Sequence, residues 1–433
     1  MTPRAEVIAV VGGGASGVLA AIHLLRDAPV PVRILIIEPR GELGRGIAYG
    51  TDDLGHLLNV RAGCLSALPD QPDHFTAWAG RGRSQVNGES FLPRAWYGVY
   101  LRSLLEPVEH VPASVTSVSA AGSRVEIHLS DGGRRTVDRV VLAPGSSPPS
   151  WPGSLGGPGD RWIDDPWSPD AFEVADPEQP VLLVGTGLTA VDAALSLHAA
   201  GHRRIVATSR HGLLPAAHPE HPYPPLPIEP PSRPTARSLF AWARATAEEA
   251  GGWGRVVDAL RPQTDSLWGA MTADERVRLL RHVQRRWETQ RHRMAPTVAR
   301  RIESMLASGQ LTVVPGGVRC AHEAPGAIQA VLGDHLVRFG AVINCTGPTA
   351  LVRQSSNPLV RNLLARRVVR PGPLGFGFDT DEAGCVPGSG RTLWLLGPLR
   401  RGRRWETTAI PEIRNQATSL PGALWRMEAM VSA

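Results

Sequence analysis

Three closely spaced glycines near the start of the chain have the spacing of a phosphate-binding turn. Gly12, Gly14 and Gly17 form G-x-G-x-x-G, directly after the apolar run 7–11 and directly before a helical pattern over 18–26. In such a turn the first glycine allows the bend, the second lets the backbone approach a pyrophosphate, and the third lets the helix pack closely on the strand. The helix N-terminus then offers unpaired N–H groups and a partial positive charge to the anion.

A second apolar run, residues 32–37, ends in an acidic residue where a bound ribose would need one. Glu38 follows Gly17 by 21 positions, and an acid about 20 residues beyond the glycines binds the ribose hydroxyls in dinucleotide sites. This spacing favours a dinucleotide over the alternative of a glycine-rich turn that binds nothing. The cofactor-binding candidates of this segment are Gly12, Gly13, Gly14, Ala15, Ser16, Gly17 and Glu38.

The glycine pattern recurs later in the chain, which predicts a second nucleotide site. Gly185, Gly187 and Ala190 form G-T-G-L-T-A after the apolar run 181–184, and alanine is tolerated in the third place of the fingerprint. The cofactor-binding candidates of this second turn are Gly185, Gly187, Leu188 and Thr189.

The strand predicted after the second turn, 204–208, is followed by Ser209 and Arg210 and carries no acid at its end. An acid here would repel a 2′-phosphate, whereas an arginine and a serine can bind one. We therefore expect Ser209 and Arg210 to bind NADPH in preference to NADH. The alternative is that Arg210 is merely exposed.

The composition indicates a globular protein. The chain has 433 residues, of which 42% are hydrophobic and 20% charged, and this suits two domains, or one large interrupted domain, with a substantial core. No apolar run approaches the ~18 residues that a membrane span needs, and no leader segment precedes the first predicted strand. We therefore expect a cytoplasmic protein with no membrane partner.

Lysine is absent, since all 46 basic residues are arginine. The absence of lysine excludes catalysis through a Schiff-base lysine, pyridoxal phosphate enzymes and nucleotide sites that need a P-loop lysine. The arginines are scattered, and the net charge of +6 does not come from a basic run interleaved with aromatic residues. We therefore expect no nucleic-acid partner, and an anionic cofactor accounts for part of the charge.

Cysteine and histidine spacing argues against metal and dithiol chemistry. The four cysteines, Cys64, Cys320, Cys345 and Cys385, form no C-x-x-C pair, which disfavours a disulfide framework, a zinc site and a redox dithiol. The histidines of segment 211–234 lack compact ligand spacing. We expect no metal there and interpret this proline-rich segment as a lid or substrate loop.

The remaining patterns predict the elements that position these segments. Alternating runs at 125–129 and 136–142 flank Asp131-Gly132-Gly133 and indicate a β-hairpin. Apolar residues at three- and four-residue spacing predict helices at 237–249, 253–260, 273–289 and 297–308. Further strands are predicted at 311–314, 327–331, 341–344 and 391–396, and a terminal helix opens at 407–411, where Pro411 fits the first turn.

Several longer stretches resemble one group of bacterial proteins. They are G-R-G-I-A-Y-G-T with H-L-L-N-V, F-L-P-R-x-x-Y-G-x-Y, V-V-D-A-L-R-P-x-T, R-H-R-M-A-P, N-C-T-G-P, and G-P-L-R-R-G-x-x-W-E-T-T-A-I-P-E-I-R. With two glycine turns 173 positions apart, the chain resembles the bacterial FAD/NAD(P)-binding proteins among the two-dinucleotide-binding-domain flavoproteins, a group similar to the N-hydroxylating flavin monooxygenases. The Baeyer–Villiger fingerprint F-x-G-x-x-x-H is missing, which counts against that branch.

The resemblance implies an α/β fold with two Rossmann-like dinucleotide-binding domains, for FAD and NADP, and an inserted helical lobe. The FAD-binding domain would span 1–179 and return at 311–433, with the NADP-binding segment at 180–234 and the lobe at 235–310. Cys345-Thr346-Gly347 would mark the return to the FAD domain. Further cofactor-binding candidates are Arg45, Asn59, Gly145, Thr346, Gly347, Gly397, Thr407 and Thr408, and the helix that opens near Thr408 would point at the flavin pyrimidine ring.

The resemblance also implies a monooxygenase. NADPH would reduce FAD, molecular oxygen would form a flavin hydroperoxide, and one oxygen atom would pass to a small nucleophilic substrate such as an amine. The catalytic residues stay open, and the candidates are Arg45, Asn59, Arg94, His292, Arg293 and Trp405. Two alternatives remain: an NAD(P)H reductase or dehydrogenase without oxygen transfer, and a non-catalytic flavin-binding partner or sensor.

Overall fold

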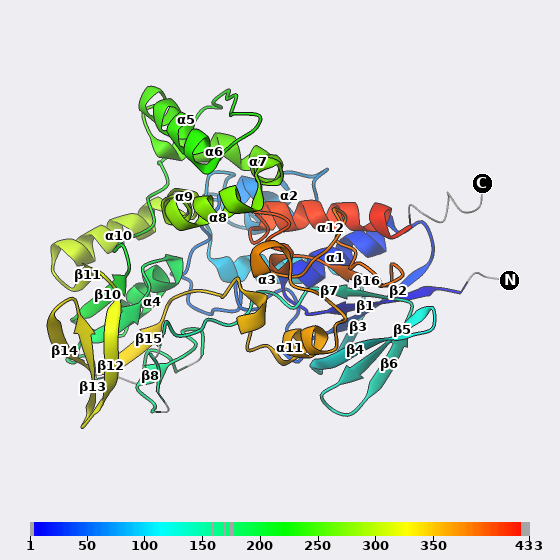
Figure 1. The fold of residues 1–433 in the computed structure, drawn as a ribbon, viewed down its shortest axis with the longest axis horizontal. Coiled ribbons are helices and arrows are strands. Elements are labelled where there is room, and N and C mark those ends of the chain that lie inside the picture. The colour runs from blue at the N-terminus through cyan, green and yellow to red at the C-terminus, as the bar shows by residue number, and fades with distance from the viewer. Residues whose placement is uncertain (1–3, 154, 158, 169, 174–175, 426–433) are drawn as a thin grey trace.

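Two five-stranded parallel sheets lie side by side, and a group of helices lies above their junction (Figure 1). This computed structural model describes residues 4–153, 155–157, 159–168, 170–173 and 176–425. The first sheet has the strand order β16-β7-β1-β2-β3 and the second the order β11-β10-β9-β15-β8. The predicted α/β fold with two Rossmann-like domains is therefore confirmed.

The strands follow the apolar runs of the sequence, because parallel sheets are covered on both faces and need apolar residues throughout. The first sheet contains β1 (Glu6–Val11), β2 (Val32–Ile37), β3 (Glu109–Val111), β7 (Arg139–Leu142) and β16 (Leu393–Leu395). The second contains β8 (Trp162–Ile163), β9 (Val181–Val184), β10 (Ile205–Ser209), β11 (Leu311–Pro315) and β15 (Ala341–Asn344). Two antiparallel sheets consist of β4 (Val115–Ala121), β5 (Arg124–Leu129) and β6 (Arg134–Val137), and of β12 (Val318–Ala324), β13 (Ala327–Leu332) and β14 (His335–Phe339).

The helices divide between the two sheets and the lobe. Those packed with the first sheet or its loops are α1 (Ala15–Asp27), α2 (His74–Ala79), α3 (Arg94–Leu104), α11 (Pro358–Ala365) and α12 (Ile410–Trp425). Those of the second domain are α4 (Leu188–Ala199) and α10 (Pro296–Ala307). The lobe contains α5 (Ala236–Glu249), α6 (Trp253–Leu260), α7 (Thr264–Ala270), α8 (Ala273–His282) and α9 (Gln284–Arg291).

Strand pairing moves two predicted domain boundaries. Residues 311–344 are predicted to lie in the returning FAD domain, but β11 pairs with β10 and β15 pairs with β9, so these strands complete the second sheet. The two-residue strand β8, within the segment predicted for the first domain, also joins the second sheet by pairing with β15. An apolar run fits either sheet equally well, and only the tertiary pairing decides between them.

Three further predictions also need correction. The hairpin at 125–142 is shorter than expected, because β6 ends at Val137 and the chain then leaves β5 to enter the first sheet as β7. The helix predicted at 273–289 is two helices, which meet at Val283. Helix α10 belongs to the second domain and not to the lobe, since Val298 and Ile302 lie in the core shared with α4.

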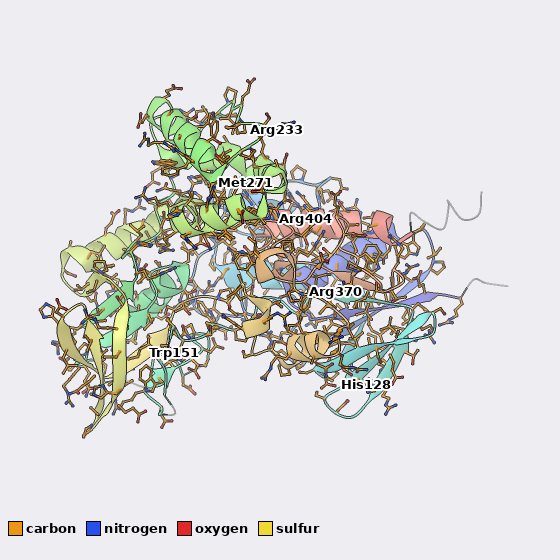
Figure 2. All side chains as sticks on the ribbon, viewed as in Figure 1. His128, Trp151, Arg233, Met271, Arg370 and Arg404 are labelled. Atoms are coloured by element: carbon orange, nitrogen blue, oxygen red, sulfur yellow. The ribbon has the colours of Figure 1, made fainter. Side chains whose placement is uncertain are left out.

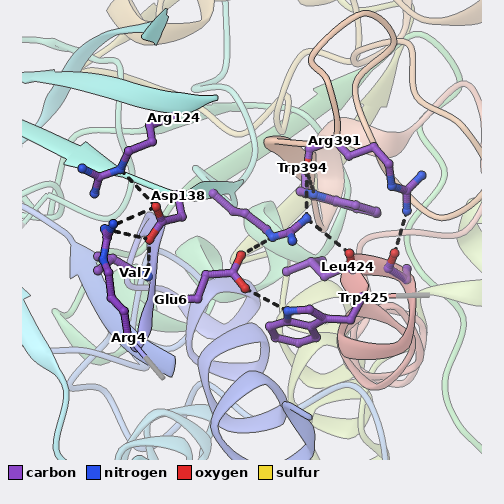
Figure 3. Close-up of polar contacts among 11 residues, drawn as sticks. Arg4, Glu6, Val7, Arg124, Asp138, Arg391, Trp394, Leu424 and Trp425 are labelled. Atoms are coloured by element: carbon purple, nitrogen blue, oxygen red, sulfur yellow. Dashed lines mark hydrogen bonds and ion pairs between the residues drawn. The ribbon is translucent and has the colours of Figure 1, made fainter. Parts of the chain in front are cut away.

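Hydrogen bonds join the C-terminal end of helix α12 to residues in and beside the first sheet (Figure 3). The Glu6 carboxylate accepts a hydrogen bond from Trp425 Nε1 (2.9 Å). Arg139 donates to the Leu424 carbonyl (3.2 Å) and Arg391 to the Ala423 carbonyl (2.6 Å). Because the last carbonyls of a helix lack partners within the helix, these arginines both satisfy them and complement the negative end of its dipole. The helix is thereby fixed in direction, with its N-terminus toward the junction of the two domains.

Candidate active site

The first glycine turn lies in close contact with the residue that follows strand β7. Gly12 has a φ of +105°, and a Cβ there would lie 2.3 Å from the Ala143 carbonyl oxygen. A Cβ at Gly17 would lie 1.8 Å from the Gly12 carbonyl oxygen. No side chain caps helix α1, whose N-cap is Gly14. The helix N-terminus therefore has backbone N–H groups without a side-chain cap, an arrangement that fits a pyrophosphate.

Glu38 lies beside this turn, as the spacing predicts. Its side chain is almost fully buried, and Oε2 accepts a hydrogen bond from the Gly13 backbone N–H (2.9 Å). Arg40 Nε donates to the other carboxylate oxygen (3.0 Å). These two bonds hold the carboxylate at the end of β2, next to the glycines, where a ribose hydroxyl can reach it.

The second glycine turn is built in the same way against strand β15. Gly185 has a φ of +129°, and a Cβ there would lie 2.1 Å from the Cys345 carbonyl oxygen. Gly187 is the N-cap of α4 without a side-chain cap, and a Cβ at this glycine would meet nothing within 4 Å. The space in front of the helix is thus open to an anion. Thr346 and Gly347 follow Cys345 and so belong to this second turn, whereas the sequence pattern predicts them in the FAD domain beside the first.

The two residues expected to select NADPH differ in exposure and in the hydrogen bonds that they already make. Arg210 is exposed. Ser209 Oγ already bonds Thr186 Oγ1 (2.8 Å) and accepts a hydrogen bond from the Gly212 N–H (3.1 Å). Arg285 of α9 donates to Thr186 Oγ1 (3.0 Å) and so brings a second guanidinium to this turn. Nothing in the sequence pattern marks Arg285, which is one of many arginines in the helical segment.

The C-terminal segment closes over the first turn. The Gly397 N–H donates to Gln416 Oε1 (3.1 Å), and Thr407 Oγ1 donates to the Gly397 carbonyl (2.8 Å). A Cβ at Gly397 would lie 2.6 Å from Ser16 Oγ in the first turn of α1. Gly397 and Thr407 therefore lie next to Ser16, although nearly the whole chain separates them in sequence. The glycine is required here by its φ of +86° as well as by this contact.

A cavity of about 220 Å³ lies between the two domains, and we call it the interdomain cavity. It is lined from the first domain by Asn59, Arg94 and Thr408, and from the second by Leu188, His292 and Arg293. Four of the six catalytic candidates thus meet in one place. Tyr49, Asp192 and Ile410 also line it and were not predicted.

The other two catalytic candidates lie elsewhere. Arg45 does not line the cavity, and its guanidinium forms ion pairs with Glu42 and Asp52. Trp405 packs against Trp268 of the lobe, with ring centroids 4.8 Å apart.

The cofactor-binding candidate Gly145 lies shortly after β7. It has a φ of +77°, and a Cβ there would meet nothing within 4 Å. The backbone at this position can therefore face a ligand without a clash.

A partly buried ion pair joins the domains at the cavity wall. Arg94, at the start of α3, lies 2.9 Å from Asp192 of α4, and its guanidinium stacks over the Trp167 ring at 4.5 Å. Burial raises the pKa of Asp192, an effect that the charge of Arg94 partly offsets. Asp192 is an acid within an otherwise apolar stretch of helix, and this was the signal by which the sequence could have marked it.

The cavity also holds a neutral imidazole. Burial, reinforced by the nearby cations Arg291 and Arg401, lowers the pKa of His292 to about 3. Its neighbour Arg293 forms an ion pair with Asp258 of the lobe. At neutral pH His292 is therefore an uncharged hydrogen-bonding group, while the positive end of α12 and the guanidinium of Arg94 favour negative charge in the same space.

The proline-rich segment 211–234 lies across the junction of the domains. His218 Nε2 lies 3.0 Å from the Asn59 carbonyl, and Arg61 donates to the Pro219 carbonyl (2.6 Å). Burial lowers the pKa of His218 to about 4. In the part of the chain that the structure describes, no group of three metal-binding side chains is found, and no helix is long and apolar enough to cross a membrane.

Comparisons with known proteins agree with this geometry. Residues 9–147, which include the first turn, match the family described as FAD-NAD(P)-binding. In fold, the chain is similar throughout its length to solved two-domain dinucleotide-binding proteins. The chain is similar to the ornithine hydroxylase of Pseudomonas aeruginosa in its reduced form (18% identity, TM-score 0.66, 98% of this chain and 99% of that one). It is also similar to the L-lysine 6-monooxygenase of Pseudomonas syringae (14%, 0.68, 98% and 99%) and to the bacillithiol disulfide reductase of Staphylococcus aureus (14%, 0.61, 98% and 99%). No protein of curated function matches the sequence significantly.

Proposed function

We propose that the protein is an NADPH-dependent FAD monooxygenase that transfers an oxygen atom to a small nucleophilic substrate, with an amine as the leading candidate. One observation carries the proposal: a single cavity lies between the second glycine turn and the C-terminal segment that contacts the first. Leu188, at the start of α4, lines it from the second turn, and Thr408 lines it from the segment that closes over the first. Two of the structures of similar fold are by name an ornithine hydroxylase and a lysine 6-monooxygenase, and both of these amino acids carry a side-chain amine.

The residues present fit both dinucleotides. FAD would bind at Gly12, Gly13, Gly14, Ala15, Ser16, Gly17, Glu38, Asn59, Gly145, Gly397, Thr407 and Thr408, and NADPH at Gly185, Gly187, Leu188, Thr189, Ser209, Arg210, Thr346 and Gly347. Both glycine turns have uncapped helix N-termini that suit a pyrophosphate, and exposed Arg210 suits a 2′-phosphate.

Bound FAD would supply the redox chemistry, by accepting electrons from NADPH and activating molecular oxygen. The chain's own residues set the environment of that chemistry. The N-terminus of α12 stabilises negative charge at the cavity. The neutral His292 can donate a hydrogen bond to the substrate's reacting group or accept one from it. Leu188, Met294 and Ile410 make part of the wall apolar, which helps to exclude water.

The test is an oxygen-transfer assay with the FAD-loaded protein. We expect NADPH to reduce the protein-bound flavin, and a substrate amine to be recovered with one added oxygen atom that derives from ¹⁸O₂. Flavin reduction by NADPH with electrons passing only to an artificial acceptor would instead establish a reductase. Absence of reduction by either NADPH or NADH would overturn both and leave a flavin-binding partner or sensor.

The reductase alternative has one observation in its favour, the similarity of fold to a disulfide reductase. The cysteines count against a dithiol mechanism. Cys64 and Cys320 are exposed, Cys345 and Cys385 are buried, and all four are free. Burial raises the pKa of the Cys345 thiol, which keeps it in the unreactive protonated form.

A further inference from the structure

A second cavity, of about 360 Å³, lies inside the helical lobe, and we call it the lobe cavity. Helices α5 to α9 surround it, and Trp405 of the C-terminal segment closes one side. We propose that the lobe cavity is the substrate pocket and that it takes an uncharged aromatic group. This inference deepens the proposed function and rests on it for the reaction that the substrate undergoes.

The lining is predominantly apolar, and its polar members are Thr264, Gln284, Arg286, Thr289 and Gln290. Trp253, Trp268, Trp287 and Trp405 contribute four indole rings, and Phe240 a phenyl ring. Among the lining residues, all of which belong to described segments, none is acidic and Arg286 is the one that carries a charge. A protonated amine or amino-acid side chain buried here would find no carboxylate to pair with, and a buried unpaired cation is strongly disfavoured.

The polar edges of two of these indoles are already occupied. Trp268 Nε1 donates to the Gly402 carbonyl (2.9 Å), and Trp287 Nε1 donates to Glu406 Oε1 (3.0 Å). What these side chains leave to a ligand is their apolar ring surface. Aromatic groups pack on such surfaces in stacked or edge-to-face arrangements, which adds to the gain from burying their area.

The cavity is a defined part of the structure and not a loose gap between helices. Arg404, labelled in Figure 2, forms an ion pair with Asp265 of α7 (2.6 Å). The Trp268–Gly402 bond holds the same helix to the same C-terminal segment, and Met271, also labelled in Figure 2, lines the cavity at the end of α7. The lobe is therefore tied to residues 402–406, directly before Thr407 and Thr408.

The lobe cavity also borders the proposed reaction space. Thr289 and Gln290 line the lobe cavity, whereas His292 and Arg293, which follow Arg291, line the interdomain cavity. On the other side, Leu213 lines the lobe cavity, and its carbonyl accepts a hydrogen bond from Thr186 of the second turn (2.7 Å). The two cavities therefore lie on either side of residues 289–293. We expect a ligand whose ring fills the lobe cavity to extend past these residues and to place its reacting atom in the interdomain cavity.

The first test is binding, measured on the FAD-loaded protein without NADPH. The probe is 1-naphthylamine, an aromatic amine that is neutral at pH 7.5, and the readout is quenching of tryptophan fluorescence together with calorimetry. We expect saturable binding of 1-naphthylamine and at least tenfold weaker binding of L-ornithine. Equal binding of the two compounds, or none of 1-naphthylamine, would overturn the proposal.

Two variants with a matched control locate the site. Ala243→Trp fills the cavity from α5, and we expect it to weaken 1-naphthylamine binding at least tenfold. Ala245→Trp adds the same side chain to the exposed face of the same helix and should leave binding unchanged. Leu267→Gln, at a half-buried lining position, provides a milder substitution if Ala243→Trp reduces FAD content or the melting temperature. Binding that all three variants retain would overturn the proposal.

Failure of the pocket and failure of the oxygenase can be told apart, because binding is measured without turnover. Binding of 1-naphthylamine with no oxygenated product from any amine under NADPH and oxygen would refute the proposed function and leave the pocket standing. Efficient oxygenation of L-ornithine with none of aromatic amines would refute the pocket and leave the oxygenase standing.

Discussion

The ion pair between Arg94 and Asp192 offers a quantitative test of how the two domains are joined. The pair is largely desolvated, with 15% and 11% of the two side chains exposed. Breaking such a pair leaves the surviving charge buried, which typically costs about 3–5 kcal/mol. The two partners should not cost the same, however, because only one of them can lose its charge.

After Arg94→Met, Asp192 can take up a proton, since burial already raises its pKa in the folded state. After Asp192→Asn, the guanidinium of Arg94 stays charged, and its Nε and Nη2 are buried without a hydrogen-bond partner among the described residues. We therefore expect Asp192→Asn to lower the free energy of unfolding by about 3 kcal/mol and Arg94→Met by only about 1–2 kcal/mol. The double variant should lie within about 1 kcal/mol of the wild type, because no charge remains buried.

The assay is urea unfolding of the FAD-loaded proteins at pH 7.5, followed by tryptophan fluorescence. In Arg94→Met, stability should also fall as the pH rises, because a carboxyl group whose pKa is raised on folding stabilises the native state only while it is protonated. Equal costs for the two single variants, or a double variant at their sum, would refute this reasoning.

Four further results are expected. Gly185→Ala should weaken NADPH binding at least tenfold with FAD retained, because the φ of Gly185 is +129° and a Cβ there would lie 2.1 Å from a carbonyl oxygen. The control Gly201→Ala, at a φ of +90° with nothing within 4 Å of the added Cβ, should leave NADPH binding unchanged. Equal NADPH affinities of the two variants would contradict this prediction. Arg210→Ala should raise the KM for NADPH far more than that for NADH, and equal effects would exclude a 2′-phosphate contact. The free energy of unfolding should fall as the pH is lowered from about 6.5 to 4, because His292 and His218, with pKa values lowered to about 3 and about 4, take up protons first in the unfolded chain. His292→Gln should reduce this pH dependence by up to ~1.4 kcal/mol per pH unit. An unchanged pH dependence in urea titrations would argue against the assignment. Iodoacetamide should label Cys64 and Cys320 in the native protein and spare Cys345 and Cys385 until unfolding, as mass spectrometry can check; labelling of Cys345 at the same rate would show that its site opens.

The sequence by itself determined the two glycine turns. The positions of Gly12, Gly17 and Gly185 follow from the turns themselves, since Gly12 and Gly185 have φ values of +105° and +129°, and a Cβ at Gly17 would meet the Gly12 carbonyl, five positions earlier. The place of Glu38 beside the first turn was predicted for a similar reason, because the length of one strand–helix–strand unit fixes how far beyond the glycines the acid must lie. These features depend on a few neighbouring residues, so their spacing in the sequence is enough.

The cavities were decided by the tertiary structure alone. Asn59, Arg94, Asp192 and His292 come from distant segments, and only the packing of one domain against the other brings them together. The prediction for residues 311–344 was wrong for the same reason, because an apolar strand carries no mark of the sheet in which it pairs. The spacing of residues along the chain determines local backbone geometry. Which strands an apolar strand pairs with depends instead on the packing of the whole chain.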